Sequence, residues 1–157
     1  MQTNAAVRRF ELDGESFVQP DFAGRGLANV APTLLQLLAP HAEADLDLPP
    51  LDRSVLPESL TSGVKTVVLI VADGLGHLQL CREIEAGNAT NFGELLARAQ
   101  TNDPCVSYTP ISSVFPTTTV AALGSVNSGV TPSDHGLLGY TLYLPEFGMV
   151  AELRIRE

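Results

Sequence analysis

Three consecutive threonines, Thr117, Thr118 and Thr119, stand directly after a proline. A threonine hydroxyl is a weak nucleophile until a base, a metal ion or the positive end of a helix dipole stabilises its alkoxide. The same hydroxyl commonly caps a helix, where it accepts a hydrogen bond from a free backbone N–H. Taken alone, the three threonines favour the capping role and leave open whether one of them reacts.

Asp73 is the carboxylate with the most suggestive position. It follows the apolar run of residues 67–72, which is typical of a strand buried on both faces of a parallel sheet. Open α/β sheets bind ligands at the carboxyl ends of such strands. Asp73 is equally suited to a helix cap or a turn, so its spacing alone does not assign a role. Gln79 stands where a dinucleotide fingerprint needs a third glycine, which argues against a nucleotide cofactor.

The elements that must position these residues alternate between strands and helices. The pattern predicts helices over residues 27–38, 77–87, 91–100 and 117–129, strands over residues 64–73 and 106–115, and two extended runs on either side of residues 145–148. This alternation predicts an α/β layered fold.

Composition narrows the class of protein. The 157 residues, of which 45% are apolar, suit a single domain 1–157 with its core in residues 64–157; residues 1–63 supply an N-terminal helix and an acidic, proline-rich connection. Nine basic residues against 18 acidic ones give a net charge of −9, which argues against a nucleic-acid partner. The start lacks the apolar stretch of a secretory signal, and residues 67–72 are far too few to span a bilayer. We therefore expect a cytoplasmic protein without membrane contact.

Asp73 and the threonine segment together resemble the type I phosphodiesterase/nucleotide pyrophosphatase branch of the alkaline phosphatase superfamily. That family's pattern has an apolar strand ending in Asp-Gly, then Phe-Pro-Thr-x-Thr, then a glycine, a proline and a His-Gly at fixed offsets. The later positions are occupied without a gap by Phe115, Pro116, Thr117, Thr119, Gly129, Pro132, His135 and Gly136. The resemblance covers roughly residues 65–145.

The resemblance implies an alkaline-phosphatase-like layered α/β/α fold with a mainly parallel central sheet, of which this chain is the N-terminal part. Its register places the nucleophile on Thr119, leaves Thr117 as the helix cap and puts Asp73 on the first metal-ligating aspartate. It further implies two divalent metal ions, usually Zn²⁺ with Mn²⁺ as the alternative. The expected chemistry is hydrolysis of a small phosphoester through a phospho-threonine intermediate.

Two departures separate the chain from the family pattern. Tyr140 stands where nucleotide pyrophosphatases generally have an asparagine that contacts a phosphate oxygen; because its hydroxyl can donate a similar hydrogen bond, Tyr140 is a substrate-binding candidate. The family's later ligands, which include an Asp-His pair and a final histidine, have no counterpart in this sequence. We therefore expect an incomplete sheet and metal site, a chain that is inactive alone, and a homo-oligomer formed through the uncovered sheet edge.

Two alternatives stay open. The chain is also consistent with a truncated module that folds without doing chemistry, and with a phosphatase or phosphonate hydrolase of the same superfamily. A sulfatase of the formylglycine type is disfavoured, because Thr119 stands where those enzymes need a cysteine or a serine.

Overall fold

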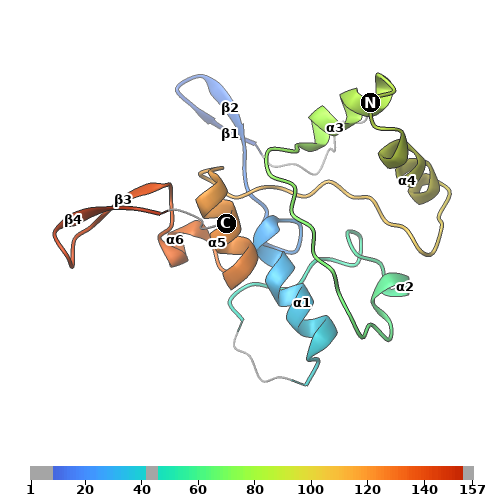
Figure 1. The fold of residues 1–157 in the computed structure, drawn as a ribbon, viewed down its shortest axis with the longest axis horizontal. Helices are drawn as coiled ribbons and strands as arrows, with labels where there is room; N and C mark the ends of the chain where they lie inside the picture. Colours follow the sequence, from blue (N-terminus) through green and yellow to red (C-terminus); the bar gives the residue numbers. More distant parts are fainter. Residues whose placement is uncertain (1–8, 42–45, 154–157) are drawn as a thin grey trace.

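The structure is a computed structural model that describes residues 9–41 and 46–153. Helices and strands occur in the order β1 (Arg9–Leu12), β2 (Glu15–Val18), η1 (Leu27–Asn29), α1 (Val30–Leu38), α2 (Glu58–Thr61), α3 (His77–Glu85), α4 (Thr90–Gln100), α5 (Thr119–Ser128), α6 (Pro132–His135), β3 (Thr141–Leu144) and β4 (Met149–Glu152). Figure 1 shows α1, α5 and α6 gathered in one cluster, whereas α3 and α4 lie apart from it.

The strands form two antiparallel hairpins. In the first, Arg9 pairs with Val18 and Leu12 with Glu15. The two turn residues are Asp13 and Gly14, with φ angles of 50° and 80°. Positive φ at both central positions is what a tight hairpin of right-handed twist requires, and Asp-Gly adopts it readily. The second hairpin pairs β3 with β4 around residues 145–148, as the sequence predicted.

The predicted helices form with small shifts of their ends. Those expected over residues 77–87, 91–100 and 117–129 correspond to α3, α4 and α5, and the one over residues 27–38 corresponds to η1 with α1. The most deeply buried apolar residues come from η1, α5 and the segment before α5, and include Ala28, Val114, Val120, Ala121 and Val126. The core therefore sits where α5 packs against η1 and α1.

Two buried polar side chains hold this core to the neighbouring loops. Asn29 is fully buried; its Oδ1 accepts from the N–H of Gly26 at 3.0 Å, and its Nδ2 donates to the carbonyls of Phe22 and Pro49 at 2.8 Å each. Thr33 donates to the Asn29 carbonyl at 2.6 Å and accepts from the N–H of Leu51 at 2.7 Å. Because every polar atom is paired, these residues fix the path of residues 49–51 along α1 without an unpaired buried group.

The predicted strands over residues 64–73 and 106–115 are not formed, which corrects the sequence-based expectation. The second segment makes an isolated parallel bridge, in which Ser112 pairs with Gly26. An interior strand of a parallel sheet needs a hydrogen-bonded strand at each edge and covering helices on both faces. Among the residues that the structure describes, none pairs with residues 64–73. A mixed helix and strand content is confirmed, whereas the layered arrangement around a parallel sheet stays a prediction.

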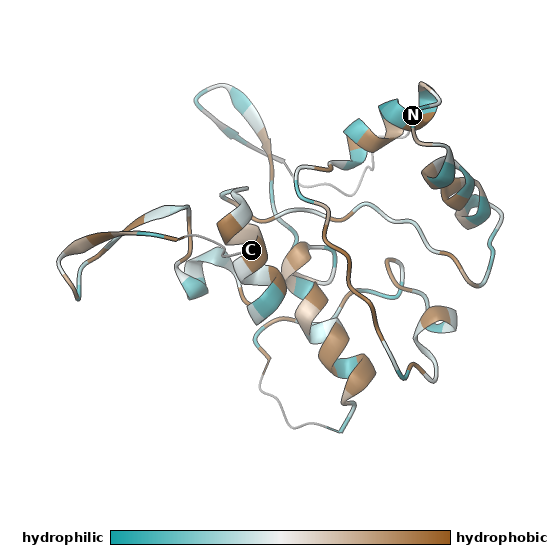
Figure 2. Cartoon of the chain, viewed as in Figure 1, coloured by the Kyte–Doolittle hydropathy of each residue, from teal (hydrophilic) through white to brown (hydrophobic). Residues whose placement is uncertain are grey.

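Figure 2 shows the apolar run between α2 and α3, and its residues Val68, Leu69, Ile70 and Val71 are exposed. In the described part of the chain, no helix is both long enough and apolar enough to cross a membrane.

Candidate functional site

The N-terminus of α5 is capped by Thr118. Its Oγ1 accepts a hydrogen bond from the N–H of Ala121 at 3.2 Å, and its backbone is extended, with φ −85° and ψ 151°. The prediction of Thr117 as the cap is therefore wrong by one position. Because a cap hydroxyl bonds the N–H two or three residues ahead, the start of the helix at Thr119 requires Thr118 as the cap.

Thr119 is the first helical residue, and the structure brings it to Asp73. Its Oγ1 lies 3.3 Å from each oxygen of the Asp73 carboxylate, although the two residues are 46 positions apart. A well-formed O–H···O hydrogen bond is about 2.5–3.0 Å long, so the hydroxyl makes a weak bond shared between two acceptors. Asp73 is exposed and Thr119 is half-buried. A hydroxyl oxygen and a carboxylate, both of which can bind a metal ion, thus face each other at the positive end of a helix.

Tyr140 is not part of this contact. Its side chain is 50% exposed, and no hydrogen bond joins its hydroxyl to Asp73 or Thr119. The loop that carries it is nevertheless held to α5, because the Thr118 hydroxyl donates to the carbonyl of Leu138 at 2.9 Å. Thr118 therefore links the helix that carries Thr119 to the loop that carries Tyr140.

His135 forms a second link between α5 and the same loop. Its Nδ1 accepts from the N–H of Leu137 at 2.9 Å, so the neutral ring carries its proton on Nε2. That nitrogen lies 3.1 Å from the hydroxyl of Ser125, which is fully buried. Both ring nitrogens are engaged, so the structure assigns His135 a positioning role in the loop; the sequence left a turn role and a chemical role open.

Gly124 makes this link feasible. A Cβ atom at residue 124 would lie 2.9 Å from Cε1 and 3.0 Å from Nε2 of His135. Gly124→Ala must therefore push the imidazole away and leave the buried Ser125 hydroxyl without its partner. Overpacking and the lost bond outweigh the gain in helix propensity of about 1 kcal/mol, so we expect a net loss of about 2 kcal/mol in the free energy of unfolding.

Gly93 offers a matched control because it also lies inside a helix. A Cβ there would meet a single close atom, Cγ2 of Ile84 at 3.3 Å, which has to shift by only a few tenths of an ångström. Gly93→Ala should therefore change the midpoint of urea unfolding much less than Gly124→Ala, which should lower it. Equal effects of the two variants would contradict the packing of His135 on Gly124.

A further cluster of polar side chains, which was not predicted from the sequence, joins two residues of α3 to Tyr108. The Nδ1 of His77 and the hydroxyl of Tyr108 are 2.8 Å apart, and Sγ of Cys81 lies 3.7 and 3.8 Å from the two ring nitrogens. Burial, and after it the neighbouring Cys81 thiol, raises the pKa of Tyr108, which keeps its hydroxyl protonated. The sequence signal for this cluster was the spacing of His77 and Cys81, which puts them on one face of a predicted helix. Tyr108 could not be predicted, because it is distant from both along the chain.

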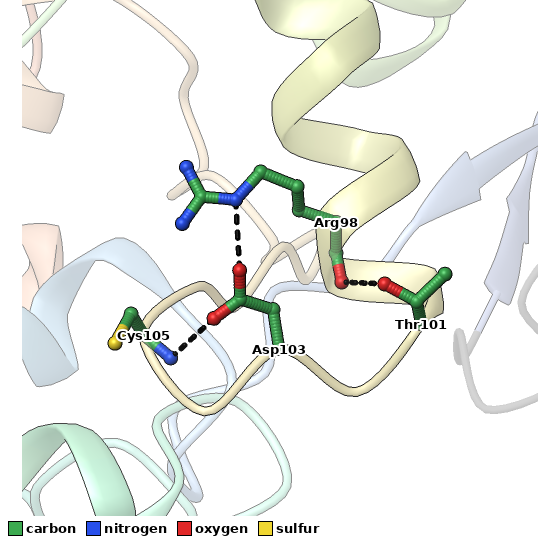
Figure 3. A network of polar contacts seen from close by, with 4 residues as sticks. All are labelled: Arg98, Thr101, Asp103 and Cys105. Carbon is green, nitrogen blue, oxygen red and sulfur yellow. Dashed lines mark hydrogen bonds and ion pairs between the residues drawn. The ribbon is translucent and has the colours of Figure 1, made fainter.

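The polar network at the end of α4 is structural (Figure 3). Nε of Arg98 donates to one oxygen of Asp103 at 2.8 Å, and the N–H of Cys105 donates to the other at 2.9 Å. These two donors lower the pKa of Asp103, with the backbone N–H as the larger cause. The hydroxyl of Thr101 donates to the Arg98 carbonyl at 2.9 Å and so helps to close the helix.

Within residues 9–41 and 46–153, no three His, Cys, Asp or Glu side chains lie close enough together to hold a metal ion. The neighbouring oxygens of Asp73 and Thr119 are therefore the candidate site among the described residues. By themselves they would supply only some of the ligands that a metal ion needs.

Comparison with known proteins identifies the family. A family model described as type I phosphodiesterase / nucleotide pyrophosphatase matches residues 67–157, which include Asp73, Thr119 and Tyr140. No curated protein and no solved structure matches the chain.

Proposed function

Because the chain belongs to the type I phosphodiesterase/nucleotide pyrophosphatase family, we propose that it carries the nucleophile and one metal ligand of a phosphodiester-hydrolysing site. The contact between Thr119 and Asp73 is the observation that supports this assignment most directly. In the proposal Thr119 is the nucleophile, Asp73 is a metal ligand, and Tyr140 contacts a phosphate oxygen of a small phosphoester substrate.

The spacing of the two residues is compatible with a shared divalent ion. Oxygen ligands bind zinc at about 2.0–2.2 Å, and in a tetrahedral site two such oxygens lie about 3.3–3.6 Å apart. The hydroxyl of Thr119 is 3.3 Å from both oxygens of Asp73, so either one can be the co-ligand without a large movement. Hard oxygen donors also suit Mn²⁺, which stays the alternative.

The reaction that we propose is an in-line displacement at phosphorus. The hydroxyl of Thr119 gives its proton to water and its oxygen attacks phosphorus, while the P–O bond on the opposite side breaks. The leaving oxygen keeps the bonding electrons and takes up a proton from water to become an alcohol. A water molecule then displaces Thr119 from the phospho-threonine and regenerates the enzyme. Two divalent ions would supply the remaining chemistry when bound: one, held in part by Asp73, would lower the pKa of the Thr119 hydroxyl, and the other would stabilise the charge of the leaving oxygen.

The position of Thr119 in α5 supports its role as the attacking group. Its oxygen lies at the first turn of the helix, where free N–H groups and the dipole favour negative charge. The neighbouring Thr118 already satisfies one of those N–H groups and anchors the helix end to the Tyr140 loop. The helix end is therefore fixed while the Thr119 hydroxyl stays accessible.

A complete site needs ligands that the described residues do not supply. A catalytic zinc ion typically takes three protein ligands and leaves one position open. Asp73 and Thr119 provide two, so we propose that the remaining ligands lie outside this sequence and that residues 1–157 alone do not catalyse hydrolysis. We also propose that the alkaline-phosphatase-like layered sheet forms only when further strands join residues 64–73.

A zinc titration tests the proposal. By calorimetry the wild-type chain should bind one ion weakly, and Asp73→Asn should abolish that binding, because the amide removes the charge of the carboxylate. Asp103→Asn is the matched control, since Asp103 is already engaged by Arg98 and Cys105. Two tightly bound ions per chain, or unchanged binding in Asp73→Asn, would contradict the proposed ligand set.

A further inference from the structure

His77 and Cys81 lie on one face of α3, where the helix brings an imidazole and a thiol together. Residues four apart are neighbours on a helix surface, and this is the spacing at which two side chains of one helix bind a shared metal ion. Sγ of Cys81 lies 3.7 Å from Nδ1 and 3.8 Å from Nε2 of His77. Cys81 is half-buried, so its sulfur is within reach of a small ion from solvent.

The separation of the sulfur and nitrogen atoms is compatible with coordination. With bonds of about 2.0 Å to nitrogen and about 2.3 Å to sulfur, the two ligand atoms lie about 3.5 Å apart in a tetrahedral site and about 4.3 Å apart in a linear one. The 3.8 Å between Sγ and Nε2 falls between these limits. The near-equal distances to both ring nitrogens place the sulfur over the imidazole ring, so a rotation of the Cys81 side chain about its Cα–Cβ bond is needed to aim it at the ion.

Tyr108 selects the ring nitrogen that is free to bind. Its hydroxyl lies 2.8 Å from Nδ1 of His77, and the centroids of the two rings are 5.8 Å apart. Burial, and after it the neighbouring Cys81, raises the pKa of Tyr108, so the phenol stays neutral and acts as a hydrogen-bond partner of the imidazole. A histidine that binds a metal ion through one nitrogen usually donates the N–H of the other to such a partner. When Nδ1–H is donated to Tyr108, the lone pair of His77 is on Nε2.

The type and number of the ligands select the ion. Thiolate favours Cu(I) and zinc, and imidazole binds both metals. A structural zinc ion takes four protein ligands in a tetrahedral site. Among the described residues no third His, Cys, Asp or Glu side chain joins this pair. Cu(I) has a filled d shell and is stable with two ligands, so a thiolate with one imidazole suits Cu(I) better than zinc.

We propose that Nε2 of His77 and Sγ of Cys81 bind one Cu(I) ion, and that Tyr108 is the positioning residue that holds the imidazole for it. On binding, the thiol gives its proton to water and a bond forms between sulfur and copper, without transfer of an electron. The site shares no ligand with the proposed centre at Asp73 and Thr119, whose hard oxygen atoms suit a different class of ion. The two proposals therefore stand or fall separately.

Competition against a chromogenic Cu(I) chelator, with ascorbate as the reductant, tests the site in the 157-residue chain. The wild-type chain should take up one Cu(I) ion. Cys81→Ser and His77→Ala should each weaken binding by more than about 100-fold, because each removes one of the two ligands. Cys105→Ser is the matched control, since Cys105 is the other free cysteine and is exposed. Equal weakening by Cys81→Ser and Cys105→Ser, or unchanged affinity in His77→Ala, would overturn the proposal.

The role of Tyr108 is tested by Tyr108→Phe, which removes only the hydroxyl. This variant should weaken Cu(I) binding about tenfold. In ¹H–¹⁵N spectra of the imidazole, Cu(I) should shift the resonance of Nε2 and leave Nδ1 of His77 protonated, a signature that loss of packing alone would not produce. Asp73→Asn should leave Cu(I) affinity unchanged, which separates this site from the proposed zinc site. Copper on Nδ1, or a Cu(I) affinity that falls with Asp73→Asn, would contradict the assignment.

Discussion

Thr119→Ala should abolish phosphodiester hydrolysis while leaving the fold intact. The change removes the oxygen that we propose as the attacking group, and loss of a nucleophile in other enzymes lowers kcat by about 10⁴-fold or more. The cap of α5 is Thr118, not Thr119, so the free energy of unfolding should change by less than about 0.5 kcal/mol. Turnover of an aryl phosphodiester is measured in a form of the protein that carries the full set of metal ligands.

Two neighbouring threonines provide the controls for that experiment. Thr117 is exposed, so Thr117→Ala should leave both turnover and stability unchanged. Thr118→Ala removes the cap and the bond to the Leu138 carbonyl, so it should cost about 1 kcal/mol of stability, unlike Thr119→Ala. Phosphosite mapping of a quenched reaction should place the phosphoryl group on Thr119. Wild-type turnover in Thr119→Ala would rule out this nucleophile whatever the metal content.

Asn29→Ala should destabilise the chain by about 3 kcal/mol. The buried side chain satisfies the N–H of Gly26 and the carbonyls of Phe22 and Pro49, and alanine removes this partner from all three groups. Each unsatisfied buried group costs about 1–3 kcal/mol, partly offset where the vacated volume admits water. Because one of the carbonyls belongs to the loop before Leu51, that loop should also lose its attachment to α1.

The matched control is Asn127→Ala. Asn127 is exposed, and its Nδ2 donates only to the carbonyl of Leu123 within α5, at 2.8 Å. Its replacement should change the midpoint of urea unfolding little, whereas Asn29→Ala should lower the midpoint with an unchanged slope. Both variants are compared at one protein concentration, because any self-association would make apparent stability depend on concentration. Equal midpoints would show that the Asn29 hydrogen bonds do not hold the loop.

The longer helices and the second hairpin were predictable because their signals are local. α3, α4 and α5 follow apolar periodicities, and the second hairpin follows two extended runs around a turn. The N-terminus of α5 was predicted less well. Thr117 and Thr118 have the same chemistry, and only the backbone shows which hydroxyl faces a free N–H. The family assignment was also within reach of the sequence, because the spacing of its motif residues is linear along the chain.

The sheet was not predictable in the same way. Residues 64–73 have the composition of a buried strand, but composition does not supply the neighbouring strands that such a strand needs. The apolar run consequently lies exposed, and Ser112 makes a single parallel bridge to Gly26. Pairing depends on segments far apart in the chain, so a pattern read within one window cannot establish it.

Residue types and spacing determined the positions of the longer helices, and the resemblance to a known family indicated that family and the pair of Asp73 and Thr119 as a candidate site. Only the tertiary structure decided that Thr118 caps the helix, that His135 bonds Ser125 across Gly124, and that His77 meets Tyr108. The physical reason is that motif and periodicity depend on neighbours along the chain. A hydrogen bond between distant side chains depends on how the elements pack, and that packing is set by the whole buried surface.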